Sequence, residues 1–293
     1  MGYTAANVFL RSLVQCDAIW VSAMKASPLV VLAGPWLLVQ LARGRETAPP
    51  RRVLVTLALA ALVGQLGGNV SFQWSLGVLG MALSVPLCLG TLILSGAVLG
   101  RVILREPLTV RILISTAILV TAIAVLSLGA GEAQQAVADT IPTAEPATFW
   151  HLAAGVAAAG LSGVAYAILG VVIRHGVKGQ ASLPVTLLTV GLVGVFSLGS
   201  LAVWRIGWEG MGATTRQDLV LMLMAGLCNA AAFLALANAL KITNVVYVNA
   251  LNSTQAAMAA VAGILLFQEA LSGQLTLGIL LTVIGLVLMS RGE

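Results

Sequence analysis

The chain of 293 residues is 59% hydrophobic and only 9% charged, whereas a soluble domain carries roughly 25% charged side chains. So few polar side chains cannot cover a water-facing surface, and the composition therefore excludes a soluble globular domain. The formal net charge of +5 comes from 15 basic against 10 acidic residues. The basic residues are dispersed through short loops, which excludes the clustered basic face of a nucleic-acid-binding protein.

Long uninterrupted apolar runs predict membrane-spanning helices, because membrane strands alternate in hydrophobicity over about ten residues. Such runs cover residues 2–14, 18–41, 53–75, 78–104, 108–129, 149–173, 183–206, 216–240, 243–267 and 273–290. We therefore predict an all-α integral membrane protein of about ten transmembrane helices. The first run is shorter than the roughly 20 residues that a span needs. Either the reading frame starts upstream of Met1, which we favour, or the first helix has half the usual length.

The chain repeats itself around its most polar connection, residues 131–148, which separates residues 1–130 from residues 149–293. An ungapped shift of 163 residues pairs Tyr3 with Tyr166, Arg11 with Arg174, Thr91 with Thr254, Gly100 with Gly263 and Glu106 with Glu269. Five helices are an odd number, so the second copy must enter the membrane from the opposite side. We predict two inverted five-helix repeats, an arrangement typical of transporters whose site lies near the midplane.

The basic residues also predict the orientation in the membrane. One set of alternate connections, which includes residues 43–52 and 101–111, holds eleven Lys and Arg residues, and the opposite set holds three. Basic residues concentrate in cytoplasmic loops. We therefore predict a multi-pass protein of the cell inner membrane, with the linker at residues 131–148 outside and the carboxyl terminus in the cytoplasm.

Two short motifs occupy matching places in the halves: Leu104-Arg105-Glu106-Pro107-Leu108-Thr109 and Phe267-Gln268-Glu269-Ala270-Leu271-Ser272. Each follows the fourth predicted helix of its half and precedes a fifth helix with Gly and Leu. In these motifs the chain resembles the EamA-type members of the drug/metabolite transporter superfamily. The resemblance implies export of small metabolites, with the first, third, fourth, sixth, eighth and ninth helices around a cavity and the second and seventh outside it.

Polar side chains inside membrane helices are costly and indicate either a site or bonding between helices. Gln65, Asn69 and Gln73 recur every four residues on one predicted helix, and other amides and tyrosines follow in the second half. We predict that they line a cavity that hydrogen-bonds a substrate without a fixed charge. The predicted substrate-binding residues are Gln65, Asn69, Gln73, Trp74, Tyr166, Asn229, Tyr247, Asn249, Asn252 and Gln255.

Lys25 is the one basic residue placed well inside a predicted helix. It could neutralise an anionic substrate or take part in proton coupling. It lies only about seven residues, near 10 Å, from the helix end, so we expect its flexible stem to reach the headgroups instead. Glu106 and Glu269 fall in loops on opposite sides of the membrane, where capping is a better expectation than proton coupling.

These patterns favour a secondary transporter that moves a small polar or amphipathic metabolite, amino-acid-like or drug-like, by alternating access. Export is the expected direction. Two alternatives remain open: an intramembrane enzyme or carrier acting on a lipid-linked substrate, and a non-transporting scaffold. We expect no catalytic residues, no cofactor and no metal site. The expected partners are a small-molecule substrate and membrane lipid, without nucleic acid, and a homodimer through a GxxxG pair such as Gly64/Gly68 is a further option.

Overall fold

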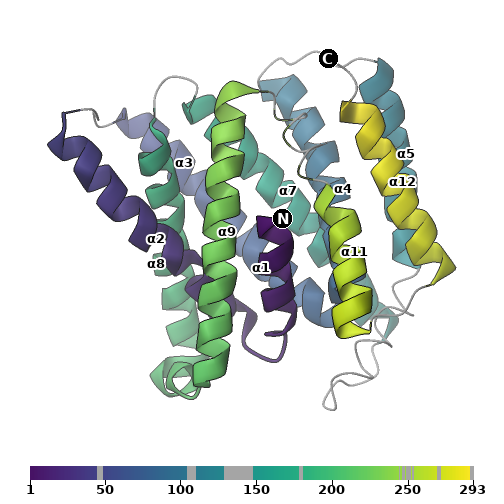
Figure 1. Ribbon diagram of the computed structural model, residues 1–293, viewed down its shortest axis with the longest axis horizontal. Coiled ribbons are helices and arrows are strands. Elements are labelled where there is room, and N and C mark those ends of the chain that lie inside the picture. Colours follow the sequence, from purple (N-terminus) through teal and green to yellow (C-terminus); the bar gives the residue numbers. More distant parts are fainter. Residues whose placement is uncertain are drawn as a thin grey trace.

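The computed structural model of the chain is a bundle of packed helices (Figure 1). It describes residues 1–44, 49–103, 110–128, 148–177, 181–243, 245, 248, 252, 254–268 and 272–290. The helices are α1 (Gly2–Arg11), α2 (Ala18–Ala42), α3 (Arg51–Val63), the π-helix η1 (Gly64–Val70), α4 (Ser71–Ile103), α5 (Val110–Leu128), α7 (Phe149–Val177), α8 (Leu183–Gly212), α9 (Arg216–Ile242), α11 (Thr254–Phe267) and α12 (Gly273–Ser290). Every regular element of these described ranges is helical, as predicted.

The outer surface of the bundle is apolar. Within the described residues, five helical segments are long and apolar enough to cross a bilayer, namely Ala18–Ala42, Arg51–Ile103, Phe149–Gly176, Leu183–Gly212 and Arg216–Ile242. Large apolar side chains such as Val31, Leu38, Phe196 and Leu265 are exposed on these and neighbouring helices. In water such surfaces would be strongly unfavourable, and lipid solvates them. The chain is therefore a multi-pass membrane protein.

Two glycines break helices that otherwise run on. Gly80 inside α4 has φ 73° and ψ 178°, and Gly207 inside α8 has φ 67° and ψ 174°. Side chains with a Cβ rarely adopt a positive φ, so glycine is the residue that allows both bends. The connection predicted between residues 75 and 78 therefore lies a few residues later, at Gly80.

The start of α2 is fixed to the connection between α8 and α9. The Asp17 carboxylate accepts hydrogen bonds from the backbone N–H groups of Ile19 and Trp20, both at 3.0 Å, and so caps α2. The same carboxylate lies 2.9 Å from Arg205 Nε, and Trp20 Nε1 donates to Thr214 Oγ1 at 3.0 Å. The loop between α1 and α2 and the loop between α8 and α9 thus meet at one end of the bundle, the lower end in Figure 1.

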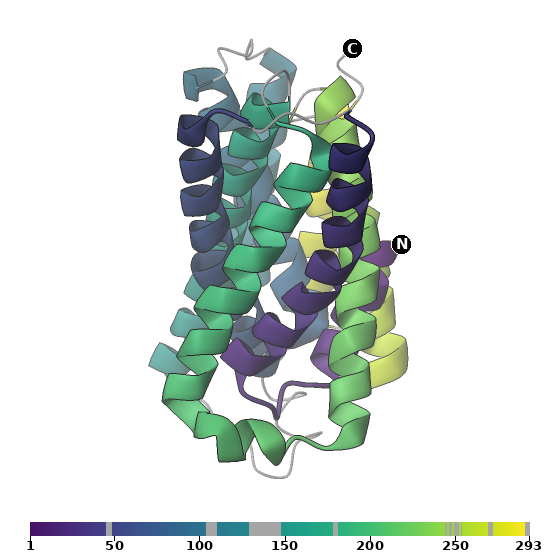
Figure 2. The same cartoon turned by 90° about the vertical axis from the view of Figure 1, so that its left-hand side faces the viewer.

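Helices from the two halves pack against each other throughout the bundle. The main pairs are α2 with α8, α4 with α7, α5 with α12, α1 with α9 and α4 with α11. Figure 2 shows α2 and α8 side by side and antiparallel. Gly64 and Gly68 face α7, where a Cβ on Gly68 would lie 2.5 Å from the Tyr166 ring. This glycine pair therefore serves packing inside the bundle.

Candidate functional site

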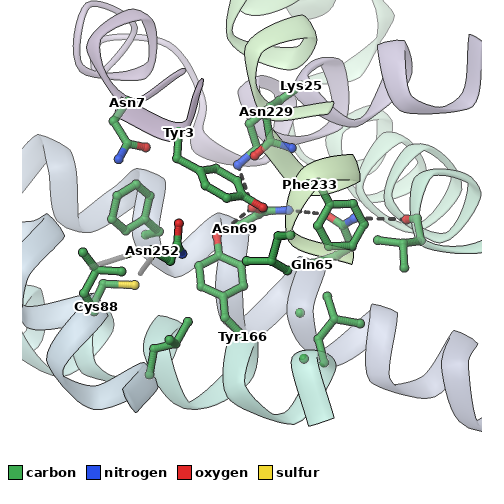
Figure 3. A pocket seen from close by; sticks show the side chains of 18 of the residues that line it. Tyr3, Asn7, Lys25, Gln65, Asn69, Cys88, Tyr166, Asn229, Phe233 and Asn252 are labelled. Atoms are coloured by element: carbon green, nitrogen blue, oxygen red, sulfur yellow. Dashed lines mark hydrogen bonds between the residues drawn. The ribbon is translucent and has the colours of Figure 1, made fainter. Parts of the chain in front are cut away.

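A cavity of about 140 Å³ lies inside the bundle, between α1, α2, η1, α4, α7, α8, α9 and α11. Nine of its described lining residues are polar, which is unusual in the interior of a membrane bundle. The polar lining residues are Tyr3, Asn7, Lys25, Gln65, Asn69, Tyr166, Asn229, Asn252 and Gln255. Figure 3 shows that side chains from several helices converge on Asn69.

Asn69 is the centre of a hydrogen-bond network in this cavity. Its Oδ1 accepts from Lys25 Nζ at 2.6 Å and from the Tyr166 hydroxyl at 2.7 Å. Its Nδ2 donates to Gln65 Oε1, and Gln65 Nε2 donates to the backbone carbonyl of Val190 at 3.1 Å. The network therefore joins α2, η1, α7 and α8.

The backbone carbonyl of Val190 sets the direction of the whole network. A carbonyl can only accept, so the Gln65 amide must present its nitrogen to Val190 and its oxygen to Asn69. Asn69 must then donate from its nitrogen to Gln65 Oε1, which leaves its oxygen facing Lys25 and Tyr166. No other assignment of the two amides satisfies every contact. Asn69 thus offers a fixed acceptor to two donors.

Local backbone features bring these side chains together. Gln65 and Asn69 both stand on η1, a π-helical segment of a kind often found at functional sites. Gly194 on α8 lets the Gln65 amide approach, because a Cβ there would lie 2.6 Å from Gln65 Nε2 and 2.8 Å from the Ala26 Cβ. The contact between η1 and α8 therefore depends on the missing side chain at Gly194.

Lys25 does not reach the headgroups, and the expectation that it would is wrong. Its side chain is 4% exposed, and its ammonium group ends on Asn69 inside the cavity. The reason is the face of α2 on which Lys25 stands, which packs towards η1 and α9. The second helix therefore contributes to the cavity, and so does the seventh, α8, through Val190, contrary to the implied arrangement in which both lie outside.

Six of the ten predicted site residues line the cavity: Gln65, Asn69, Tyr166, Asn229, Asn252 and Gln255. Gln73 and Trp74 are not among the lining residues. Tyr247 and Asn249 lie outside the described residues. The structure therefore brings together side chains of η1, α7, α9, α11 and the segment before α11, and separates Gln73 and Trp74 from them.

The π-helix explains why Gln73 and Trp74 point elsewhere. A π-turn holds one residue more than an α-turn, which rotates all later side chains by about 100° relative to earlier ones. Gln73 therefore leaves the face of Gln65 and Asn69, and its Nε2 donates to the Leu10 carbonyl at 3.0 Å. Trp74 is 39% exposed and packs on His151, with ring centroids 5.6 Å apart.

Besides Lys25, two polar lining residues were not among the predicted site residues, Tyr3 and Asn7 on α1. They stand four residues apart, on one face of the short helix, and Tyr3 is the repeat partner of Tyr166. The family resemblance implied that the first helix borders the cavity, and Tyr3 and Asn7 bear this out, but neither residue was among the predicted site residues. Within the described residues, Tyr3, Asn7, Asn229 and Asn252 make no side-chain hydrogen bond, which leaves their polar groups available to a ligand.

The comparisons with known proteins agree with this picture. Residues 153–291 match the model of the EamA-like transporter family. No curated protein sequence matches the chain. Among solved structures, a crystal structure of a protein superposes with a TM-score of 0.65 at 15% identity, over 99% of this chain and 95% of the other, which shows the fold alone. The resemblance found in the sequence is thus confirmed for the second half of the chain, which matches the model of a family of membrane transporters.

Proposed function

We propose that this protein is a secondary transporter that moves a small polar or amphipathic metabolite by alternating access. The observation that carries the proposal is the polar cavity in the interior of an apolar bundle. A scaffold gains nothing from nine polar side chains around a cavity, since each of them is costly at membrane depth. The EamA-like family match supports transport in preference to catalysis or scaffolding.

Two inverted five-helix repeats, residues 1–130 and 149–293, are part of the proposal. Shifted by 163 residues, α5 would cover residues 273–291, and α12 covers Gly273–Ser290. The same shift carries the bend at Gly80 to Thr243, where α9 ends in an extended conformation with ψ 175°. The helix pairs α2–α8 and α5–α12 join elements that correspond under this shift. Rocking of one repeat against the other would expose the cavity alternately to each side.

Export across the inner membrane, with the carboxyl terminus in the cytoplasm, is the proposed direction and orientation. The excess of basic residues in one set of connections supports the orientation. Residues 131–148, which hold three acidic residues and no basic one, would then form an extracytoplasmic linker. Substrate and lipid are the proposed partners, and a homodimer remains compatible with the apolar outer surface.

Uptake into proteoliposomes tests the proposal. Uptake of a panel of radiolabelled neutral amino acids and short amphipathic acids is measured for the purified parent protein, Asn69→Ala and Asn252→Ala. Asn69→Ala removes the acceptor shared by Lys25 and Tyr166, so we expect at least a tenfold loss of uptake, and a smaller loss for Asn252→Ala. Asn238→Ala is the matched control, because Asn238 is an exposed amide on α9. Unchanged uptake by both folded cavity variants would show that the cavity is not the transport site.

A further inference from the structure

The ammonium group of Lys25 is only partly used by the protein. It carries three protons, and within the described residues one of them is donated, to Asn69 Oδ1 at 2.6 Å. Lys25 lines the cavity, so the other protons are available to a bound molecule. The site can therefore donate two further charge-assisted hydrogen bonds, which are about twice as strong as neutral ones.

The positive charge of Lys25 has no carboxylate beside it in the part of the chain that the structure describes. The acidic residues of that part are Asp17, Glu209 and Asp218, and none of them lines the cavity. A buried cation without a counter-charge is costly. An anion that enters the cavity removes this cost, whereas a second cation adds to it.

The position of the ammonium group is set in advance. Asn69 Oδ1 faces Lys25 because Gln65 and the Val190 carbonyl fix the direction of both amides. Tyr166 holds the same oxygen from the other side at 2.7 Å. A ligand therefore meets a positive charge that is already placed, which lowers the ordering cost of binding.

The remainder of the cavity suits an apolar body with a few hydrogen-bonding groups. Leu89, Leu92, Leu169, Phe233 and Leu236 line it. Asn229 and Asn252 add neutral amides that make no side-chain hydrogen bond within the described residues. One cationic point beside an apolar wall matches an amphipathic molecule with one negative charge.

From these observations we infer that the cavity binds amphipathic monocarboxylates, with the carboxylate on the Lys25 ammonium group and the apolar body against the leucines and Phe233. The inference rests on the transport cavity proposed above and replaces a substrate without fixed charge by an anionic one. A phosphate monoester carries nearly two charges at neutral pH, and the described lining holds a single cation for it. Monocarboxylates are therefore favoured over phosphorylated compounds.

The test measures binding to the full chain in detergent, without transport. Butyrate, hexanoate, octanoate, benzoate and 3-phenylpropionate are titrated, each against its uncharged carboxamide and its amine analogue. The parent protein should bind at least one carboxylate ten times more tightly than the matching amide, and should bind the amine most weakly. Hexyl phosphate should bind more weakly than hexanoate.

Variants at two lysines locate the effect. Lys25→Met should bind carboxylate and amide equally, while Lys25→Arg keeps the preference for the carboxylate. Lys241→Met is the matched control, because Lys241 is exposed at the end of α9 and the same charge is removed there; it should behave as the parent. If the parent binds no carboxylate of the panel more tightly than the matching amide, the inference is overturned. It is also overturned if folded Lys25→Met still binds the carboxylate more tightly. If Lys25→Met does not fold, the comparison of carboxylate and amide binding by the parent decides by itself.

The two proposals fail separately. A carboxylate preference without uptake into proteoliposomes would leave the anion site standing and refute transport. Uptake of uncharged or cationic compounds that is unaffected in Lys25→Met would leave transport standing and refute the anion site.

Discussion

Two buried cations, Lys25 and Arg174, are held in opposite ways. Each side chain is 4% exposed. Arg174 Nη1 donates to the carbonyl of Leu240 at 3.0 Å and also to the carbonyl of Thr243, so its charge closes the carboxyl end of α9. Lys25 instead donates to one side-chain oxygen, Asn69 Oδ1, at the wall of a cavity. A cation bound to backbone carbonyls at a helix end serves the fold, whereas a cation at a cavity wall is available to a ligand.

Arg174→Met should produce the largest change in stability. The substitution leaves two carbonyl groups at the end of α9 without their charged donor, and such bonds contribute roughly 1.5–3 kcal/mol each. We expect a loss of about 3 kcal/mol, measured as a lower thermal midpoint in detergent, with unchanged ligand preference in the folded fraction.

Arg205→Met is the control for Arg174→Met. Arg205 pairs with Asp17 at 2.9 Å but its side chain is 61% exposed, and exposed pairs contribute at most about 1 kcal/mol. A midpoint for Arg174→Met that equals the parent, or that falls no further than Arg205→Met, would contradict the structural role of Arg174.

Gly194→Ala should disturb the hydrogen-bond network that holds Lys25, and not the contacts of Arg174. The new Cβ would lie 2.6 Å from Gln65 Nε2, which forces the amide away from the Val190 carbonyl. Asn69 then loses its fixed direction and can turn its nitrogen towards Lys25. We expect roughly tenfold weaker binding of the preferred ligand, following the loss of about one hydrogen bond to a charged group.

Gly199→Ala on the same helix is the matched control, because no atom lies within 4 Å of a Cβ at that position. It should bind ligand as the parent does. Equal binding by Gly194→Ala and Gly199→Ala would show that the direction of the Gln65–Asn69 network does not matter for the site.

The comparison also shows which features a sequence can predict. The apolar run at 273–290 matches α12, Gly273–Ser290, and the run at 18–41 matches α2, Ala18–Ala42, because helix length follows directly from hydrophobicity and caps such as Asp17. The fate of Lys25 does not follow from its distance to the helix end. That fate depends on which face of α2 meets η1, and this is decided by contacts more than 40 residues away in the chain, such as the one with Asn69.

The predicted polar stripe failed for a local reason. An interval of four residues from Gln65 to Asn69 to Gln73 indicates one face only while the helix is α-helical. The π-helix at Gly64–Val70 rotates Gln73 off that face. The spacing of the polar residues does not predict a π-helix. From the sequence, Gly64 and Gly68 were an optional dimer contact; in the structure, the missing side chains of Gly64, Gly67 and Gly68 let α7 lie close to η1.

The last and smallest effect is the labelling of Cys16, which tests on which side of the membrane the end of the bundle with Arg174 lies. Cys16 lies in the loop between α1 and α2, at the end opposite the close of α9 (Figure 1). Partial burial, then Asp218 and Asp17, raise the pKa of the Cys16 thiol. The thiolate is the reactive form, so labelling by a membrane-impermeant maleimide should be slow at pH 7 and accelerate as the pH rises.

In intact cells, labelling of the Cys16 peptide, detected by mass spectrometry, should occur without permeabilisation if Arg174 and the carboxyl terminus face the cytoplasm. Asp218→Asn removes one negative charge and should speed the reaction by a few-fold at pH 7, because a lower thiol pKa gives more thiolate. Cys88 is buried in the cavity wall and should stay unlabelled in the same cells, which makes it an internal control. Labelling of Cys16 only after permeabilisation would contradict the proposed orientation. The end of the bundle with Cys16 would then face the cytoplasm, and an exported monocarboxylate would approach Lys25 from that end.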